Sequence, residues 1–143
     1  MTKRFEAVTP ASGWHPKFTF SAATRVGDLV FVSGTTAGDE KGRIVGEGDI
    51  VRQTEVIYEK IARVLAAAGC TLADVVETTE YYLTLENYEK TAEVRRRVFG
   101  GPPYPAATGV QCAGLIRPGA LIEIKAIAVA PKVTPYPAPR GTP

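Results

Sequence analysis

Hydrophobic and polar positions alternate most clearly near the end of the chain, in residues 121–129. Successive side chains of a strand point to opposite faces, so Glu123 and Lys125 share one face while Ile122 and Ile124 occupy the other. A carboxylate in so apolar a strand costs free energy unless another group pairs with it or a reaction uses it. Glu123 is therefore the first candidate for a functional residue.

The preceding apolar stretch, residues 107–115, reads as a second strand. The segment Arg117-Pro118-Gly119 lies between the two stretches, and its proline and glycine are typical of a tight turn. We therefore expect residues 107–115 and 121–129 to form a β-hairpin.

Aromatic and β-branched residues predict four further strands, at residues 5–8, 18–26, 29–33 and 75–83. The run Leu29 to Val32 has no polar break, which predicts a strand that is buried on both faces. Ser33, Gly34 and Thr35 follow at its end. Their hydroxyl and N–H groups either meet a ligand oxygen or satisfy one another in a turn.

Two segments have the spacing of amphipathic helices, residues 50–68 and residues 86–99. Asp49 is expected to cap the first helix and Gly69 to end it. Tyr88, Ala92, Arg95 and Phe99 lie along one side of the second. The run of arginines at positions 95–97 is interpreted as a solvated cluster that complements the helix dipole, because three consecutive helical residues point in three directions.

The order of these elements predicts an α+β fold: a two-layer sandwich in which a mixed sheet carries two helices on one face. Residues 1–131 form one domain, and the proline-rich tail at 132–143 is expected to be extended or disordered. The other face of the sheet also contains apolar residues. Further copies of the chain would cover it most simply, so we expect a closed oligomer with ligand clefts between subunits.

Composition narrows the function classes. The 143 residues include 17 basic and 15 acidic side chains, a formal charge of +2, without long runs of either sign. This balance does not favour a nucleic-acid or membrane partner. Cys70 and Cys112 lack metal-ligand spacing and a disulfide framework, so we expect reduced thiols in a cytoplasmic protein. No phosphate-binding loop is present, and neither a metal nor a cofactor is expected.

Three segments resemble the YjgF/RidA, or Rid, family: RVGDLVFVSGTTA, VLAAAGCTLADVVETTEYYLTLENY and PAATGV…LIRPGALIEIKAIAV. The resemblance spans residues 18–131. It implies a chorismate-mutase-like fold, a homotrimer and three clefts at subunit interfaces. It also implies cofactor-free hydrolysis of reactive enamines and imines, such as 2-aminoacrylate, to a 2-keto acid and ammonia.

The family's cleft residues carry over only in part. Its glutamate matches Glu123 and its serine matches Ser33. The arginine that binds a substrate carboxylate in the family's deaminases falls on Ala107. The other three polar cleft positions, a tyrosine, a cysteine and an asparagine, fall on Phe20, Gly109 and Ala92.

Alanine cannot replace a guanidinium fork, so ordinary 2-imino acid deamination is not expected. The chain resembles the arginine-less subgroups of the family. Its cleft is expected to be larger and more apolar than that of the deaminases, with Phe20, Ala107 and Gly109 making room.

Two hypotheses follow for a small-molecule metabolite. The first is a hydrolase or deaminase for a bulkier enamine or imine, and the second is a trimer that binds a metabolite without turnover. A structural alternative pairs Glu123 with Lys125 or Arg117 at a subunit contact. Ribonuclease activity, associated with some members of the family, is disfavoured by the near-neutral charge.

The candidate catalytic residues are Glu123 and Ser33, and the candidate substrate-binding residues are Phe20, Gly34, Thr35, Tyr88, Ala92, Ala107 and Gly109.

Overall fold

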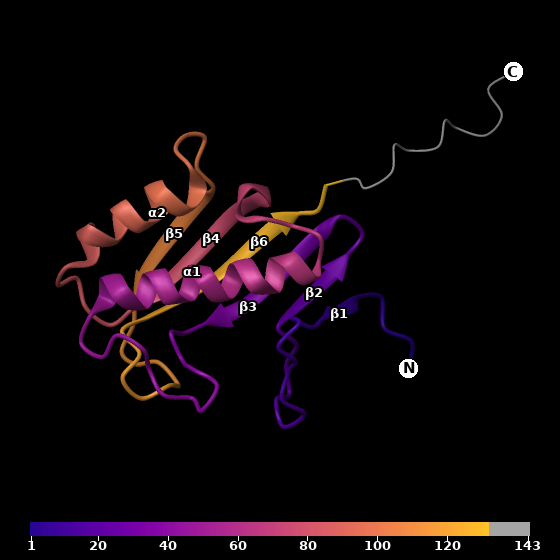
Figure 1. Cartoon of the computed structure of the whole chain (residues 1–143), viewed down its shortest axis with the longest axis horizontal. Coiled ribbons are helices and arrows are strands. Elements are labelled where there is room, and N and C mark those ends of the chain that lie inside the picture. Colours follow the sequence, from indigo (N-terminus) through magenta and orange to yellow (C-terminus); the bar gives the residue numbers. More distant parts are fainter. Residues whose placement is uncertain (132–143) are drawn as a thin grey trace, which may run out of the picture.

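A six-stranded mixed sheet with the strand order β1-β2-β3-β6-β4-β5 forms one layer of the protein (Figure 1). The structure, a computed structural model, describes residues 1–131, so the predicted proline-rich tail lies outside the described residues. In chain order the elements are β1 (Glu6–Val8), β2 (Ala23–Val26), β3 (Leu29–Thr35), α1 (Ile50–Ala67), η1 (Leu72–Asp74), β4 (Val75–Tyr82), η2 (Tyr88–Lys90), α2 (Thr91–Phe99), β5 (Ala106–Gln111) and β6 (Ile122–Val129).

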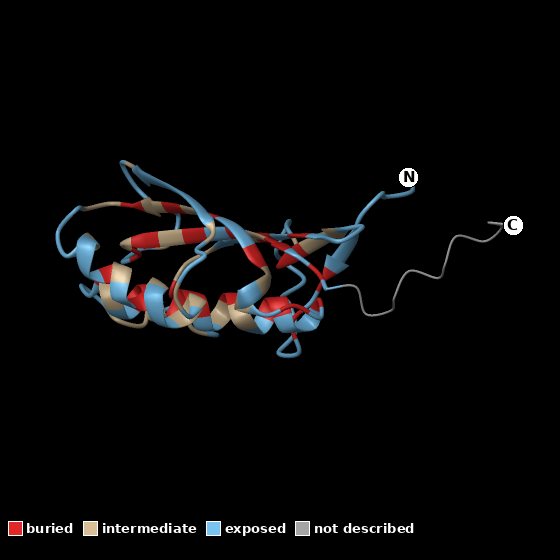
Figure 2. Ribbon diagram, turned by 90° about the horizontal axis from the view of Figure 1, so that it is seen from above, coloured by how far each residue is buried: buried red, intermediate tan, exposed pale blue. Residues whose placement is uncertain are grey.

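The two α-helices form the second layer, on one face of the sheet. Helix α1 packs across β3 and β6 and against α2, which lies over β4 and β5 (Figure 1). The Asp49 side chain caps α1 by accepting from the Arg52 N–H at 3.0 Å, as expected from the sequence. Buried residues are concentrated where the helices and the sheet face each other (Figure 2). The predicted α+β fold with two helices on one face is confirmed.

Strand β6 lies at the centre of the sheet and bonds to both β3 and β4. Its alternation agrees with the sequence pattern: Ile122 and Ile124 are fully buried under the helices, while Glu123 and Lys125 occupy the opposite face. The strand therefore carries the core on one face and the candidate carboxylate on the other.

The predicted hairpin of residues 107–115 and 121–129 is wrong. Strand β5 pairs with β4 in parallel, and β4 pairs with β6 in an antiparallel manner, so β4 separates the two strands of the expected hairpin. The reason is helix α2, which connects β4 to β5 and provides the crossover that a parallel pair needs. A turn at residues 117–120 does exist, with the Ala120 N–H donating to the Arg117 carbonyl at 3.1 Å, but it does not join paired strands.

Two other expectations need correction. Strand β3 is not buried on both faces of the subunit, because both helices lie on one side: Val30 is 0% exposed, whereas Leu29 and Phe31 are 41% and 39% exposed. The second helix is also shorter than residues 86–99. Asn87 has a left-handed φ of 60°, and the chain then forms the short η2 turn before α2 starts at Thr91.

Gln53 joins α1 to the chain that enters β6. It is fully buried, and its amide Nε2 donates to the carbonyls of Gly46 and Gly119 at 3.0 and 3.2 Å. Its Oε1 accepts from the Leu121 N–H at 2.8 Å. Because Leu121 precedes β6, this one side chain helps to set where β6 begins and thus where Glu123 lies.

Within residues 1–131, neither helix combines the length and apolarity needed to cross a bilayer.

Gln53→Leu is expected to lower the free energy of unfolding by about 2–4 kcal/mol, because it leaves two carbonyls and one N–H without their partner. Urea unfolding at fixed protein concentration measures this change. Gln111→Leu is the matched control: Gln111 is exposed on the edge strand β5, and its loss should cost less than about 1 kcal/mol. Equal costs for the two variants would contradict a linking role for Gln53.

Candidate functional site

Glu123 lies on the sheet face that the helices leave open, beside an irregularity in β3. The pairing of β3 with β6 shifts between Val32 and Thr35, so Ser33 and Gly34 form a bulge next to Glu123. A Cβ built on Gly34 would lie 2.5 Å from Glu123 Oε1, so the carboxylate occupies the space that any larger residue at position 34 would need. Glycine at position 34 therefore permits the close approach of the carboxylate to the backbone, and a larger residue there would displace the Glu123 side chain.

Two hydroxyls at the β3 irregularity donate their protons to the main chain. Ser33 Oγ donates to the Ser21 carbonyl at 2.6 Å, and Thr35 Oγ1 donates to the Ser33 carbonyl at 3.0 Å. A hydroxyl that donates its one proton in this way keeps its oxygen lone pairs as acceptors. Ser33 is thus arranged to accept a hydrogen bond from a ligand rather than to donate one.

Phe20 belongs to a small exposed aromatic cluster with Trp14 and Phe18. The ring centroids of Phe20 lie 5.5 Å from Trp14 and 5.2 Å from Phe18, and Trp14 Nε1 donates to the Phe20 carbonyl at 2.7 Å. The next residue, Ser21, accepts the Ser33 hydrogen bond. This contact ties the aromatic segment to the end of β3, while the Phe20 ring itself remains 51% exposed.

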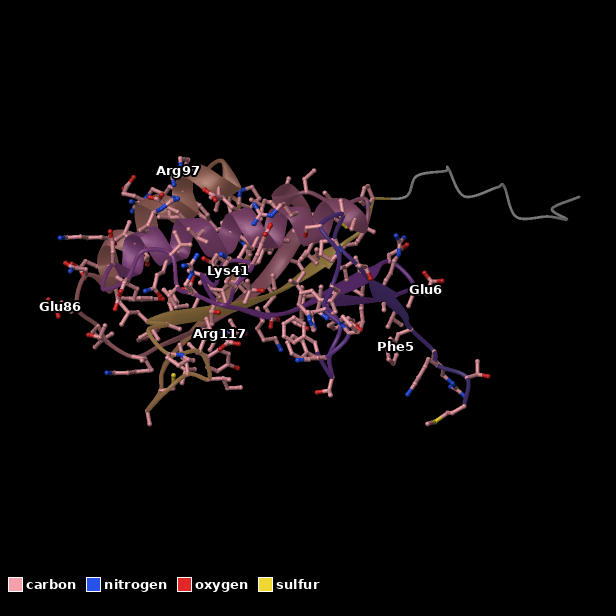
Figure 3. The ribbon with its side chains drawn as sticks, turned by 60° about the horizontal axis from the view of Figure 1, so that its bottom comes forward. Phe5, Glu6, Lys41, Glu86, Arg97 and Arg117 are labelled. Atoms are coloured by element: carbon pink, nitrogen blue, oxygen red, sulfur yellow. The ribbon has the colours of Figure 1, made fainter. Side chains whose placement is uncertain are left out.

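Glu123 forms no ion pair within residues 1–131. The Arg117 guanidinium instead lies over the loop after β3, where a Cβ on Gly42 would be 2.9 Å from its Nη1. Figure 3 shows Arg117 on the loop that precedes β6, and Arg97 on the helix layer. The alternative in which Glu123 pairs with Lys125 or Arg117 is therefore not realised inside one subunit.

A second set of predicted residues surrounds a pocket of about 220 Å³ between α2 and the edge strand β5. Ala92 and Ala107 line this pocket together with Arg95, Phe99 and Tyr104. Most of its lining is aliphatic or aromatic, and arginine side chains enter from α2. The pocket therefore suits an apolar group that also carries a negative charge.

A buried polar network lies behind this pocket. The Glu80 carboxylate, 2% exposed, accepts from Tyr88 Oη at 2.7 Å, from Tyr58 Oη at 3.3 Å and from Arg95 Nη1 at 3.3 Å. Arg95 Nη1 also donates to Thr91 Oγ1 at 2.7 Å. A buried charge of this kind is tolerated when it is paired and hydrogen-bonded, and here the network fixes Arg95 in the pocket wall.

The two tyrosines remain proton donors in this network. Burial raises the pKa of the Tyr58 hydroxyl well above its ordinary value, and the negative charge of Glu80 raises it further. Burial and the hydrogen bond to Glu80 likewise raise the pKa of Tyr88. Both hydroxyls are therefore neutral at physiological pH and share the Glu80 carboxylate with Arg95.

Gly109 does not enlarge the cleft, contrary to expectation. A Cβ at this position would lie 3.2 Å from a ring carbon of Tyr82 and 3.3 Å from Tyr88 Oη. These two tyrosines are stacked, with ring centroids 4.2 Å apart. They already fill the space beside position 109, so only Ala92 and Ala107 leave room in the pocket.

Within one subunit the candidate residues fall into two groups on opposite faces of the sheet. Ala107 is the partner of Thr78, which faces the helices and is 2% exposed, so Ala107 shares that face. Glu123 is paired with Tyr81 on the open face. Ser33 and Gly34 join Glu123, whereas Tyr88, Ala92 and Gly109 join Ala107.

Comparison with known proteins identifies the family of this chain. A sequence model of the family described as Endoribonuclease L-PSP matches residues 12–130. The RutC family protein YjgH of Escherichia coli K12 is 38% identical over 130 residues, covering 88% of this chain and 95% of YjgH. This chain belongs to the same family.

Solved structures of this YjgF/Rid family have the same fold. That of protein YJGH has a TM-score of 0.77 at 36% identity, covering 91% of this chain and 99% of that chain. Rv2704 from Mycobacterium tuberculosis, described as a member of the YjgF/YER057c/UK114 family, has a TM-score of 0.73 at 36% identity and covers 88% of this chain and 99% of its own.

Sequence reasoning missed the roles of Glu80, Tyr58 and Arg95. Arg95 is not part of a purely solvated cluster: it pairs with buried Glu80, whereas Arg96 pairs with Glu93 and Arg97 lies 3.7 Å from Glu55. The available signals were the alternation of Thr78, Glu80 and Tyr82, and the position of Arg95 one turn after Thr91.

Residues 1–131 contain no group of three or more histidine, cysteine or acidic side chains placed to hold a metal ion.

Gly34→Ala is expected to cost about 1 kcal/mol of unfolding free energy, because the added methyl group displaces the Glu123 carboxylate from its place against the backbone. Most of this cost should disappear in the Glu123→Ala background, where the colliding group is gone. Urea unfolding of the four proteins measures the coupling. Gly114→Ala is the control: a Cβ there meets no atom within 4 Å, so its cost should stay within about 0.5 kcal/mol. A Gly34→Ala cost that is the same in both backgrounds would refute the contact.

Proposed function

We propose that the protein is a cofactor-free hydrolase of the Rid type, acting on an enamine, an imine or a related small metabolite. The observation that carries this proposal is the Glu123 carboxylate. It lies on the open sheet face, against a glycine backbone, and no cation of the described subunit neutralises it. A carboxylate held in this way is suited to general acid–base chemistry.

The cleft in this proposal is completed by a neighbouring copy of the chain. Glu123 with the β3 bulge, and the pocket beside Ala107, lie on opposite faces of one sheet and cannot contact the same small molecule within a subunit. The open face also exposes Leu29, Phe31 and Val129, which a neighbouring subunit would cover. A closed homotrimer, typical of this family, brings the Glu123 face of one copy against the pocket of the next.

The proposed reaction is hydrolysis of a C=N bond. Glu123 accepts a proton from a water molecule as the water oxygen bonds to the imine carbon. It then returns that proton to the nitrogen, which gives a carbinolamine. Glu123 next takes the remaining hydroxyl proton and transfers it to the nitrogen as the C–N bond breaks, so the products are a carbonyl compound and ammonia. An enamine enters the same path after tautomerisation, in which its carbon gains a proton and its nitrogen loses one to give the imine.

The β3 bulge would orient the substrate. Bulges leave backbone groups outside the strand ladder, and the N–H groups near Gly34 and Thr35 are suited to a substrate oxygen. Ser33 Oγ, whose proton is held by the Ser21 carbonyl, would accept a hydrogen bond from the water or from the imine nitrogen. In this arrangement Ser33 positions the reactants and does not act as a nucleophile.

Alanine at position 107 makes ordinary 2-imino acids poor substrates in this proposal, because the β5 strand offers no guanidinium fork. The space next to Ala92 and Ala107 favours a bulkier apolar group. Free thiols at Cys70 and Cys112 and chemistry without a cofactor are compatible with a cytoplasmic protein. The alternative is a trimer that binds its metabolite without turnover, with Glu123 accepting a hydrogen bond from the ligand.

The test is ammonia and keto-acid release from 2-aminoacrylate and from the imines of leucine and phenylalanine, generated in place by an amino-acid oxidase. We expect the wild type to accelerate hydrolysis of at least one bulky imine. Glu123→Gln should reduce that rate by about 100-fold or more, because the amide cannot take the proton. Glu77→Gln, on the neighbouring strand β4, is the matched control and should retain the wild-type rate.

Full activity of Glu123→Gln would contradict the assigned role. If no imine is turned over, Ala107→Arg distinguishes a hydrolase with a different substrate from a trimer that only binds its metabolite. A gain of activity on small 2-imino acids would indicate a competent scaffold with an altered ligand, and the hydrolase proposal would be narrowed to that ligand. If both proteins are inert, the binding trimer is the better account.

A further inference from the structure

The pocket beside β5 contains a cation that the family's motif does not supply. Position 107, where the deaminases' arginine would project from the strand, is an alanine, but Arg95 and Arg96 line the same pocket from helix α2. Arg96 is exposed and pairs with the exposed Glu93, whereas Arg95 is mostly buried and is the cation held in the pocket wall. In helix α2, Arg95 lies one turn after Thr91 and close to Ala92. A guanidinium group is therefore present in this pocket, although it arises from a different element.

The hydrogen bonds of Arg95 leave one edge of its guanidinium for a ligand. All of its hydrogen bonds to residues 1–131 involve Nη1, which contacts both oxygens of Glu80 and Thr91 Oγ1. An arginine has five N–H donors, so those on Nε and Nη2 are not used by the described chain. The side chain is 22% exposed and lines the pocket. These donors are the ones that the proposal below assigns to a ligand.

Arg95 is also fixed in place before any ligand arrives. Glu80 and Thr91 hold Nη1, and the Tyr88 ring centroid lies 5.6 Å from its Cζ. The hydroxyls of Tyr58 and Tyr88 share the Glu80 carboxylate, so Glu80 positions Arg95 without enclosing it. A donor fork that is already oriented loses little conformational freedom on binding a carboxylate.

The rest of the pocket favours an apolar group on the ligand. Phe99, Tyr104 and Pro105 provide apolar walls, and the small side chains of Ala92 and Ala107 leave the volume between them open. An arginine projecting from position 107 would occupy part of that volume. With the cation on α2 instead, a carboxylate can be held beside the helix while an apolar group extends toward β5.

We propose that Arg95 is the anion-recognition residue of the cleft, and that the ligand is a carboxylate with a bulky apolar or aromatic substituent. The binding of this ligand does not depend on the proposed function. Only the reaction that the bound ligand undergoes rests on the proposed function. For a hydrolase the substrate is then an aromatic or branched-chain 2-imino acid, and the corresponding 2-keto acid is the product.

The test uses phenylpyruvate and the uncharged 1-phenylpropan-2-one, in which a methyl group replaces the carboxylate. Isothermal titration calorimetry with the wild-type protein should show phenylpyruvate binding roughly 10- to 100-fold more tightly than the ketone, as expected for hydrogen bonds to a charged group. Pyruvate, which has the carboxylate but no aromatic ring, should bind more weakly than phenylpyruvate. Equal affinity for phenylpyruvate and the ketone would overturn the proposal, whatever any variant does.

Variants assign the effect to Arg95. Arg95→Gln should weaken phenylpyruvate binding roughly 10- to 100-fold and leave the ketone unchanged. Arg97→Gln, on the same helix but outside the pocket, should bind both compounds like the wild type. Because Arg95→Gln leaves Glu80 buried without its cation, the double variant Glu80→Gln/Arg95→Gln is prepared as well. A folded variant lacking Arg95 that still prefers phenylpyruvate would refute the assignment.

This inference and the proposed function fail in distinguishable ways. In the Glu123→Gln background, the preference for phenylpyruvate over the ketone should still depend on Arg95 even where no imine is hydrolysed. Turnover that depends on Glu123 without a preference for the acid over the ketone would refute the role of Arg95 alone. A preference that depends on Arg95 without any turnover would refute the hydrolase and retain the binding site.

Discussion

The position of strand β6 at the centre of the sheet is the constraint on which the rest of the structure depends. It is hydrogen-bonded to β3 on one side and to β4 on the other, and its alternating side chains face either the helices or the open side. Ile122 and Ile124 complete the core under α1, so Glu123 has to occupy the uncovered face. A shift of one residue would bury the carboxylate and expose both isoleucines, and burial therefore selects this register strongly.

Much of the fold follows from local patterns. The cap at Asp49, the long α1 helix and the two faces of β6 were all predictable from spacing and residue type, since each depends on residues that are close in sequence. The pairing of β5 was not. Residues 107–115 and 121–129 are neighbours along the chain, but α2 returns β5 parallel to β4, and only the arrangement of the whole sheet shows that β4 separates them.

The candidate site likewise has one residue that the local sequence could identify and one that it could not. Glu123 could be identified from the sequence because a carboxylate in an apolar strand is unusual within a short window. Arg95 could not, because its partner Glu80 lies on another element and each residue alone has an ordinary solvated interpretation. The helix side of the sheet thus carries a neutralised ion pair that holds a guanidinium in a pocket. The open side carries the carboxylate, and in the proposed trimer a second copy of the chain brings the two together.

Subunit mixing tests that arrangement most directly. Glu123→Gln subunits lack the acid–base group, and Ala107→Trp subunits have the pocket filled, so each homo-oligomer should be inactive on the imine that the wild type hydrolyses fastest. Co-expressed in equal amounts, they should form mixed oligomers in which about one quarter of the clefts combine an intact Glu123 with an intact pocket from the neighbouring copy. Recovery of about that fraction of wild-type activity is the predicted result. Mixed oligomers as inactive as their parents would contradict a cleft shared between subunits.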